Sequence, residues 1–317
     1  MELESKCPLC GRSTNVVVTT RLRRGTGIVF YCTICDHGFL ALGKVVDAKE
    51  YYAKEYRREV SHIASGEATN ARELFDVYSR YQDERLRIVS PYLSPSKTLL
   101  EVGASAGQFL MHVKNKVARV GAIELDGACC DFMRERLGIE ADSEFLRESR
   151  FANERYDIVC SFQVLEHIES PISFLRDLKL SMKENGVAFV EVPNLRDPLL
   201  TVWDIESYKS FYYHSAHLQY FTENSLRKAA VEAGFESGRI TVHFSQDYNL
   251  LNHLNWVMNG TPQPTCDIGL SPVHITGHNP EIAGWLDERM TKLNAEYITK
   301  LVEAKATSNL MMVLSLV

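Results

Sequence analysis

The sequence predicts an α/β fold in which a mostly parallel sheet carries helices on both faces, preceded by a small cysteine-rich module. Two observations predict the sheet. Between residues 96 and 193, short apolar segments alternate with helical stretches, a pattern typical of parallel sheets. The chain then closes on LMMVLSLV, an apolar run of strand length. The module is indicated by two CxxC pairs within the first 35 residues.

Composition excludes several classes of protein. The chain has 317 residues, of which 45% are hydrophobic and 24% are charged, which is ordinary for a globular protein of about two domains. Its net charge of -6 gives no general attraction to nucleic acid or to anionic membranes. No apolar run is long enough to span a bilayer, and the segment MELESK has no signal-like apolar region. We therefore expect a cytoplasmic protein with reduced thiols.

The first element is a metal-binding ribbon over residues 1–45. Its candidate ligands are Cys7, Cys10, Cys32 and Cys35, in two CxxC turns separated by 21 residues. Two such turns complete a tetrahedral site, and four thiolates leave no open position, so we expect structural Zn²⁺. The segments VVVTT and GIVFYC predict two strands. The basic turn RLRRG between them is either a phosphate contact or a solvated hairpin tip.

Residues 46–95 follow as a helical linker or lid. Apolar residues recur there at helical intervals, which predicts one or two helices. Tyr51, Tyr52 and Tyr56 either form a lid over a ligand or pack on the core.

The large unit spans residues 96–317. Its predicted strands are TLLEVG, ARVGAIELD, IEAD, YDIVCSF and GVAFVEV, with helices at GQFLMHVKNK, before Leu137 and from Pro171. GRITVHF and the C-terminal run predict a closing antiparallel pair. Residues 246–307 form an insertion with a helix from Trp285 to Ala306, which either walls an acceptor pocket or forms a homodimer face.

A glycine-containing loop follows the first of these strands. In EVGASAG, Gly103 permits a sharp turn and Gly107 permits close approach of a ligand. The next strand ends in Glu124, a carboxylate suited to ribose hydroxyls. The pattern is GxxxG rather than GxGxxG, which favours a nucleoside cofactor without phosphates over a dinucleotide.

On these residues the sequence resembles the class I S-adenosylmethionine (SAM)-dependent methyltransferases, in the small-molecule branch with an N-terminal zinc ribbon, from Cys7 to about Phe244. The resemblance implies a Rossmann-like sheet with an antiparallel final strand. The sequence departs from the family's motif at Ser105, which replaces a glycine of that motif. The run YDIVCSFQVLEHI, with Glu166 and His167, is similar to the family's fourth motif. The cofactor contacts that the resemblance implies are Glu101, Gly103, Ala104, Ser105, Gly107, Glu124, Leu125, Asp142, Ser143, Ser161, Phe162 and Gln163.

The candidate base lies in the segment after the fifth strand, where aromatic and histidine side chains crowd together. We expect His217 to act as general base, with His214 as second candidate, because imidazole titrates near neutral pH. An anchoring hydrogen bond is the alternative role for His217. Nucleotide-sugar C-methyltransferases have a related YHEH, but this chain reads YHSAH, so that assignment does not transfer. Acceptor contacts are expected from Tyr213, Tyr220 and His167.

The function that we expect is methyl transfer from SAM to a hydroxyl, or a carbon, of a small molecule. The acceptor class is a sugar, a nucleotide-sugar or a glycan precursor. The alternatives are a zinc-ribbon RNA methyltransferase and a non-catalytic SAM-binding module. The missing [DNS]PP[YFW] motif and the net charge of -6 argue against a nucleic-acid substrate.

Overall fold

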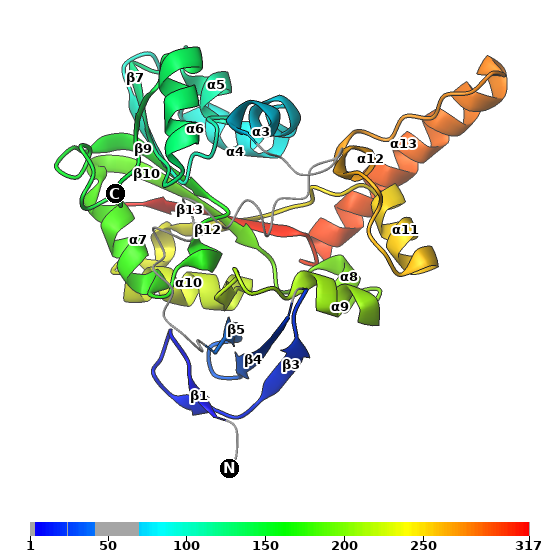
Figure 1. Ribbon diagram of the computed structural model, residues 1–317, viewed down its shortest axis with the longest axis horizontal. Coiled ribbons are helices and arrows are strands. Elements are labelled where there is room, and N and C mark those ends of the chain that lie inside the picture. The colour runs from blue at the N-terminus through cyan, green and yellow to red at the C-terminus, as the bar shows by residue number, and fades with distance from the viewer. Residues whose placement is uncertain (1–3, 24, 42–69, 317) are drawn as a thin grey trace.

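A seven-stranded sheet forms the centre of the molecule in a computed structural model that describes residues 4–23, 25–41 and 70–316 (Figure 1). The strand order is β12-β13-β10-β9-β6-β7-β8. Strand β13 is antiparallel to both of its neighbours, and strands β6 to β10 pair in parallel. The predicted fold class is therefore confirmed. The strands are β6 (Thr98–Val102), β7 (Arg119–Ile123), β8 (Glu140–Asp142), β9 (Tyr156–Phe162), β10 (Met182–Pro193), β12 (Ile240–Ser245) and β13 (Asn309–Ser315).

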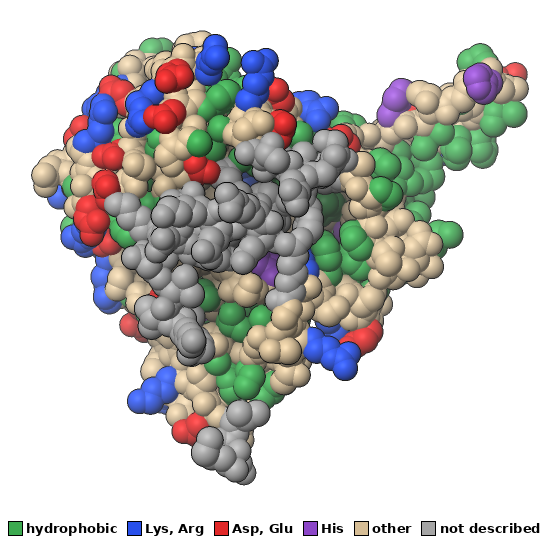
Figure 2. All heavy atoms as spheres, in the orientation of Figure 1, with side chains coloured by type: hydrophobic (Ala, Val, Ile, Leu, Met, Phe, Trp, Pro, Cys, Tyr) green, Lys and Arg blue, Asp and Glu red, His purple; other side chains and the backbone are tan. Residues whose placement is uncertain are grey.

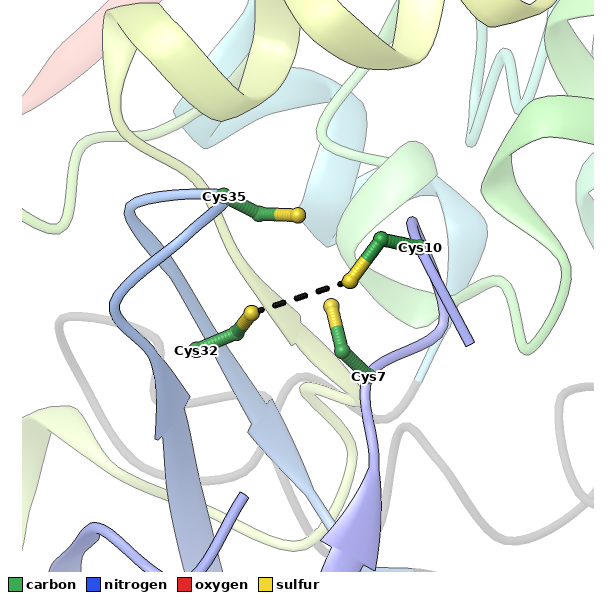
Figure 3. A group of neighbouring side chains, drawn as sticks. All are labelled: Cys7, Cys10, Cys32 and Cys35. Carbon is green, nitrogen blue, oxygen red and sulfur yellow. Dashed lines mark hydrogen bonds between the residues drawn. The ribbon is translucent and has the colours of Figure 1, made fainter. Parts of the chain in front are cut away.

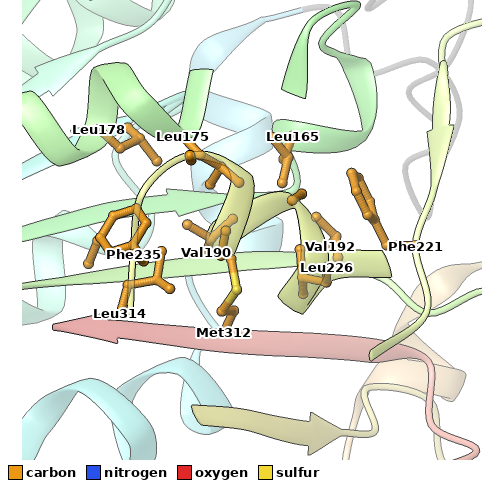
Figure 4. Close-up of a cluster of buried hydrophobic side chains, with 14 of the residues drawn as sticks. Leu165, Leu175, Leu178, Val190, Val192, Phe221, Leu226, Phe235, Met312 and Leu314 are labelled. Carbon is orange, nitrogen blue, oxygen red and sulfur yellow. The ribbon is translucent and has the colours of Figure 1, made fainter. Parts of the chain in front are cut away.

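Helices cover both faces of this sheet. Alternate residues of β10 bury on opposite sides, with Val190 in one hydrophobic cluster and Phe189 in the other. Figure 4 shows the first cluster, where Leu175 of α7 and Leu226 of α10 meet Met312 of β13. Burial on both faces explains why β10 reads as a continuous apolar run. The covering helices are α3 (Ala71–Tyr78), α4 (Asp83–Val89), α5 (Leu110–Val113), α6 (Gly127–Phe132), α7 (Pro171–Leu180) and α10 (Glu223–Glu232), with the short helices η2 (Ser90–Tyr92), η3 (Met133–Leu137), η4 (Leu165–His167) and η5 (Ser237–Arg239).

Helix α10 has a cap at its N-terminus and a glycine after its C-terminus. The Thr222 side chain accepts a hydrogen bond from Ser225 N, and Gly234 follows the helix with φ +92°. The predicted helix GQFLMHVKNK is shorter than expected, since only α5 within it is α-helical and its flanks are turns.

The insertion after β12 contains α11 (Leu250–Asn259), α12 (Cys266–Leu270) and α13 (Pro280–Glu303). Helix α13 begins before the predicted Trp285, because Asn279 caps the chain and Pro280 suits the first helical position. It projects from the rest of the molecule (Figure 1) and carries exposed hydrophobic side chains, among them Ile282, Trp285 and Leu293 (Figure 2). None of the described helices is both long and apolar enough to cross a bilayer.

The cysteine-rich ribbon shares a sheet with the large unit. Strand β11 (Gln219–Tyr220), which follows helices α8 (Pro198–Thr201) and α9 (Glu206–Tyr212), pairs antiparallel with β5, so the order is β11-β5-β4-β3. Ribbon residues such as Leu9 and Phe30 also belong to the hydrophobic cluster of the central sheet. The ribbon therefore has no core of its own among the described residues. Its strands are β1 (Ser5–Lys6), β2 (Ser13–Thr14), β3 (Val17–Arg21), β4 (Thr26–Cys32) and β5 (His37–Leu40).

The basic turn of the ribbon packs against α9. The Arg23 guanidinium lies 3.8 Å from the centroid of the Phe211 ring, and Arg23 Nε donates to Phe211 O at 2.5 Å. The Arg23 side chain is thus packed against the large unit rather than surrounded by solvent. The first part of the predicted linker, with Tyr51, Tyr52 and Tyr56, lies outside the described residues.

Candidate functional site

The glycine loop after β6 has the backbone that its sequence predicts. Gly103 and Gly107 both have φ +81°. A Cβ on Gly103 would lie only 2.2 Å from Val164 Cγ2, so space as well as conformation requires glycine there. Ser105 has φ 49°, a left-handed conformation that explains why glycine is the usual residue at this point of the motif.

Glu124 is held against this loop from the end of β7. Its Oε2 accepts a hydrogen bond from Ser105 N at 2.7 Å, and its Oε1 accepts one from Asp126 N at 3.0 Å. Leu125 continues the same turn. Each carboxylate oxygen has a second lone pair, so Glu124 can also accept hydrogen bonds from a ligand's hydroxyls.

The remaining predicted cofactor residues lie at the ends of β8 and β9. Asp142 O accepts from Glu124 N at 3.0 Å, which places Asp142 and Ser143 beside the end of β7. The Phe162 ring packs on Phe109, the residue before α5, with centroids 5.0 Å apart. Ser161 is fully buried inside the sheet.

Glu101 is a buried carboxylate directly before the glycine loop. It is 3% exposed, and its Oε2 accepts no hydrogen bond from the described part of the chain. Burial raises its pKa to about 8, although the Arg85 guanidinium opposes that rise. Such a group suits a ligand that carries a positive charge.

A buried ion pair between Arg85 and Glu191, which the sequence does not reveal, lies beside the end of β9. Arg85 Nε donates to both carboxylate oxygens of Glu191, at 3.1 and 3.0 Å, and its guanidinium lies 4.8 Å from the centroid of the Phe162 ring. The Gln163 side chain donates to Glu191 Oε1 at 2.9 Å and to Asn309 Oδ1 at 3.1 Å. Gln163 is therefore part of this buried network.

Three histidines and one glutamate meet beside the glycine loop. His167 Nδ1 donates to Ala216 O at 2.7 Å, and His167 Nε2 lies 3.8 Å from Glu166 Oε1. His217 Nε2 lies 3.9 Å from the same oxygen. The centroids of the His214 and His217 rings are 3.7 Å apart. We call Glu166, His167, His214 and His217 the histidine cluster.

The position of the cluster follows from two short connections. Val164, which contacts Gly103, is two residues before Glu166 on the chain that leaves β9. Leu218 N donates to Glu166 O at 2.8 Å, which fixes the segment after α9 over η4. The cluster therefore lies next to the glycine loop at the carboxyl end of the parallel strands, where ligands of such sheets bind.

Burial sets the protonation of the cluster. It lowers the pKa of His214 to about 2 and of His167 to about 4, and it lowers the pKa of His217 well below the ordinary value. It raises the pKa of Glu166, which is 1% exposed, to about 8. At neutral pH the imidazoles are neutral and able to accept a hydrogen bond or to bind a metal.

Tyr213 and Tyr220 form a buried wall under these histidines. Their ring centroids are 5.0 Å apart, and they are 5% and 1% exposed. The Tyr220 hydroxyl donates to His214 O and accepts from His214 N, both at 3.2 Å. Tyr220 therefore fixes the turn that carries His214.

The four ribbon cysteines converge on one point (Figure 3). Their sulfur atoms all lie within 4.8 Å of one another, and Cys10 Sγ lies 3.8 Å from Cys32 Sγ. Tetrahedral Zn²⁺ with Zn–S bonds of about 2.3 Å separates its sulfurs by about 3.8 Å. The cluster thus fits a zinc ribbon. Cys129, Cys130 and Cys160 are buried elsewhere in the chain.

Sequence reasoning did not select Glu166, Arg85 or Glu191 as site residues. A signal existed for Glu166, because a Glu-His pair directly after a buried strand places two polar side chains at the ligand edge of a parallel sheet. No local signal pairs Arg85 with Glu191, which are brought together only by the fold.

The chain is similar to known methyltransferases in sequence and in fold. Residues 71–237 match a family of methyltransferase domains. Among solved structures, a SAM-dependent methyltransferase from Archaeoglobus fulgidus is 16% identical with a TM-score of 0.49, over 77% of this chain and 96% of that one. A chain of the Haloferax volcanii complex that contains the Trm112 methyltransferase activator is 11% identical with a TM-score of 0.49, over 86% and 99%. No curated protein matches. The family match spans more than half of the chain, so the protein belongs to the family of methyltransferase domains.

Proposed function

We propose that this enzyme transfers the methyl group of SAM to a hydroxyl of a small polar acceptor, in the class of sugars, nucleotide-linked sugars or glycan precursors. The observation that carries the proposal is the histidine cluster, which places neutral imidazoles beside the glycine loop. A hydroxyl acceptor needs a group that accepts its proton or its hydrogen bond, and neutral imidazole provides this.

The residues at the strand ends fit SAM. The Glu101 Oε2 atom, which has no hydrogen-bond partner within the described part of the chain, suits the ammonium group of the methionine part, and the Glu124 carboxylate suits the ribose hydroxyls. We assign the adenine contact to Asp142 and Ser143. The bound cofactor supplies an activated methyl group on a sulfonium, so the protein's main task is to align the acceptor.

On the acceptor side, we assign the first contact with the hydroxyl to His217. Its side chain is 15% exposed, against 1% for Glu166, so it reaches nearest to solvent. His214 lies against it as the second candidate. Tyr213 and Tyr220 pack against the turn that carries His214. His167 donates a hydrogen bond to the backbone carbonyl of Ala216.

Binding and turnover measurements on the same variants test this assignment. We expect His217→Ala to keep SAM binding in calorimetry while turnover falls about 100-fold or more, the usual effect of losing a general base. The exposed His112→Ala is the matched control and should leave both unchanged. Turnover is followed as S-adenosylhomocysteine release over a panel of sugars and nucleotide-sugars. Absence of SAM binding at millimolar concentration would overturn the proposal, and full turnover in His217→Ala and His214→Ala would remove both histidines from it.

We also infer that Cys7, Cys10, Cys32 and Cys35 hold one structural Zn²⁺. The 3.8 Å separation between two of the sulfurs supports this inference. The site has four thiolates and no open position, so its role is to hold the ribbon together. Metal analysis of purified protein should find zinc that Cys32→Ser no longer retains.

A further inference from the structure

We propose that Glu166, His167 and His217 form a second metal site, which takes a divalent transition-metal ion such as Zn²⁺ or Mn²⁺ and presents it to the methyl acceptor. The role of this site toward a hydroxyl acceptor rests on the proposed function.

The distances suit one shared ion. The three ligand atoms lie within 4.8 Å of one another, and Glu166 Oε1 is 3.8 Å from His167 Nε2 and 3.9 Å from His217 Nε2. Metal bonds to imidazole nitrogen and carboxylate oxygen are about 2.0–2.2 Å, so two ligands of one ion lie at most about 4.2 Å apart. Each of the two distances from Glu166 to a histidine is thus short enough for one shared ion, and a small closure of the 4.8 Å spread would bring in the third ligand.

The burial of Glu166 is the second observation. Its side chain is 1% exposed, and neither of its carboxylate oxygens accepts a hydrogen bond from the described residues. A buried carboxylate in this state is costly unless it is paired, protonated or bound to a metal. Two imidazoles and one carboxylate form a donor set that suits Zn²⁺, Mn²⁺ and Fe²⁺.

The surroundings orient the ligands as metal sites require. His167 Nδ1 donates to Ala216 O at 2.7 Å, so the nitrogen that faces Glu166 is Nε2. A hydrogen bond from the other ring nitrogen to a backbone carbonyl is the usual support of a metal-binding histidine. The Glu166 backbone is held in turn by Leu218 N, which connects it to the segment that carries His217.

Unlike the cysteine site, this site has three protein ligands among the residues that the structure describes, and three ligands leave a position open. His217 is 15% exposed, which leaves an edge of the site accessible. An acceptor hydroxyl that binds the ion becomes more acidic and releases its proton to water. Its oxygen then forms the new C–O bond as the methyl C–S bond breaks, and the sulfur keeps the electron pair as a neutral thioether. With the ion bound, His217 would act on the hydroxyl through that ion, in place of the direct contact proposed above, and its loss would still lower turnover.

Metal stoichiometry tests the site independently of turnover. Metal-free protein is titrated with Zn²⁺ and, in parallel, with Co²⁺, whose absorption distinguishes a thiolate site from an N/O site. We expect two equivalents in the wild type, of which only one shows thiolate-to-metal charge transfer. Glu166→Gln and His217→Gln should lose the other equivalent, with affinity reduced at least about 100-fold. Glu169→Gln, an exposed carboxylate on the same segment, is the matched control and should keep both.

A single equivalent in the wild type, with Zn²⁺, Mn²⁺ and Co²⁺ alike, would overturn the proposal, as would a second equivalent that both variants retain. Thermal unfolding checks that the variants fold. If Glu166→Gln does not fold, the test relies on His217→Gln, because residue 217 is partly exposed. SAM calorimetry separates the two proposals. Two metals without SAM binding would refute the proposed function alone, whereas SAM-dependent transfer with one metal would refute the second site alone.

Discussion

Replacing Glu101 with glutamine should make the ligand-free protein more stable at alkaline pH. The Glu101 carboxyl is 3% exposed, and burial raises its pKa from 4.5 to about 8. Gln keeps the shape and polarity of the protonated acid but carries no proton to lose. The variant therefore removes only the ionisation of this group.

The sign and size of the effect follow from that pKa. Between about pH 4.5 and about pH 8, the unfolded chain has released the Glu101 proton while the folded chain still holds it, so stability falls as pH rises through this window. The full difference corresponds to about 5 kcal/mol, at about 1.4 kcal/mol for each tenfold step. Glu101→Gln avoids this loss. The difference in free energy of unfolding between the variant and the wild type should be near zero at the acid end of this pH window. Above the window, the variant should be the more stable by several kcal/mol.

Urea unfolding at a series of pH values measures this difference. Comparing variant with wild type at each pH cancels the titration of all other groups. Glu148→Gln, an exposed carboxylate, is the control and should show no pH-dependent difference. Saturating SAM should reduce the advantage of the variant, since we propose that the ammonium group of SAM pairs with the wild-type Glu101 carboxylate. If Glu101→Gln is no more stable than the wild type above pH 8, the carboxylate is hydrated and the reasoning about a buried, ligand-facing acid fails.

Three further substitutions give separate tests. Arg85→Met leaves Glu191, 4% exposed, without its partner and should lower the free energy of unfolding by about 3–5 kcal/mol in urea; a loss below about 1 kcal/mol would contradict the buried pair. Gly103→Ala places a Cβ 2.2 Å from Val164 Cγ2 at φ +81°, so calorimetry should show SAM affinity reduced by at least about tenfold. Cys10→Ser should release zinc and lower the thermal unfolding midpoint, and an unchanged zinc content would show that the ribbon does not bind it as inferred.

The sequence predicts the parallel strands well, because each carries its own local signal. The β10 run GVAFVEV is apolar on both faces, and the loop Glu101–Gly107 requires positive φ at residues that are glycine. The spacing of the two CxxC pairs likewise predicts that the ribbon cysteines converge. Such features depend on residues close together in the chain.

Other features depend on residues that only the fold brings together. Glu166 and His217 belong to different segments, and their proximity depends on how the turn after α9 folds back over η4. The basic turn of the ribbon reads as a solvated tip, yet Arg23 packs on Phe211. The apolar pattern predicts that α13 begins at Trp285, whereas the cap at Asn279 starts the helix earlier.

The pairing of β5 with β11 affects how truncated and chimeric variants of this enzyme should be designed. The family match begins at residue 71, which suggests that the catalytic part is a transferable unit. A chain that begins at residue 71 would expose the edge of β11 and the apolar surface that the ribbon covers, next to the turn that carries His214 and His217. Any chimera meant to exchange the acceptor side between relatives should therefore carry the ribbon with it.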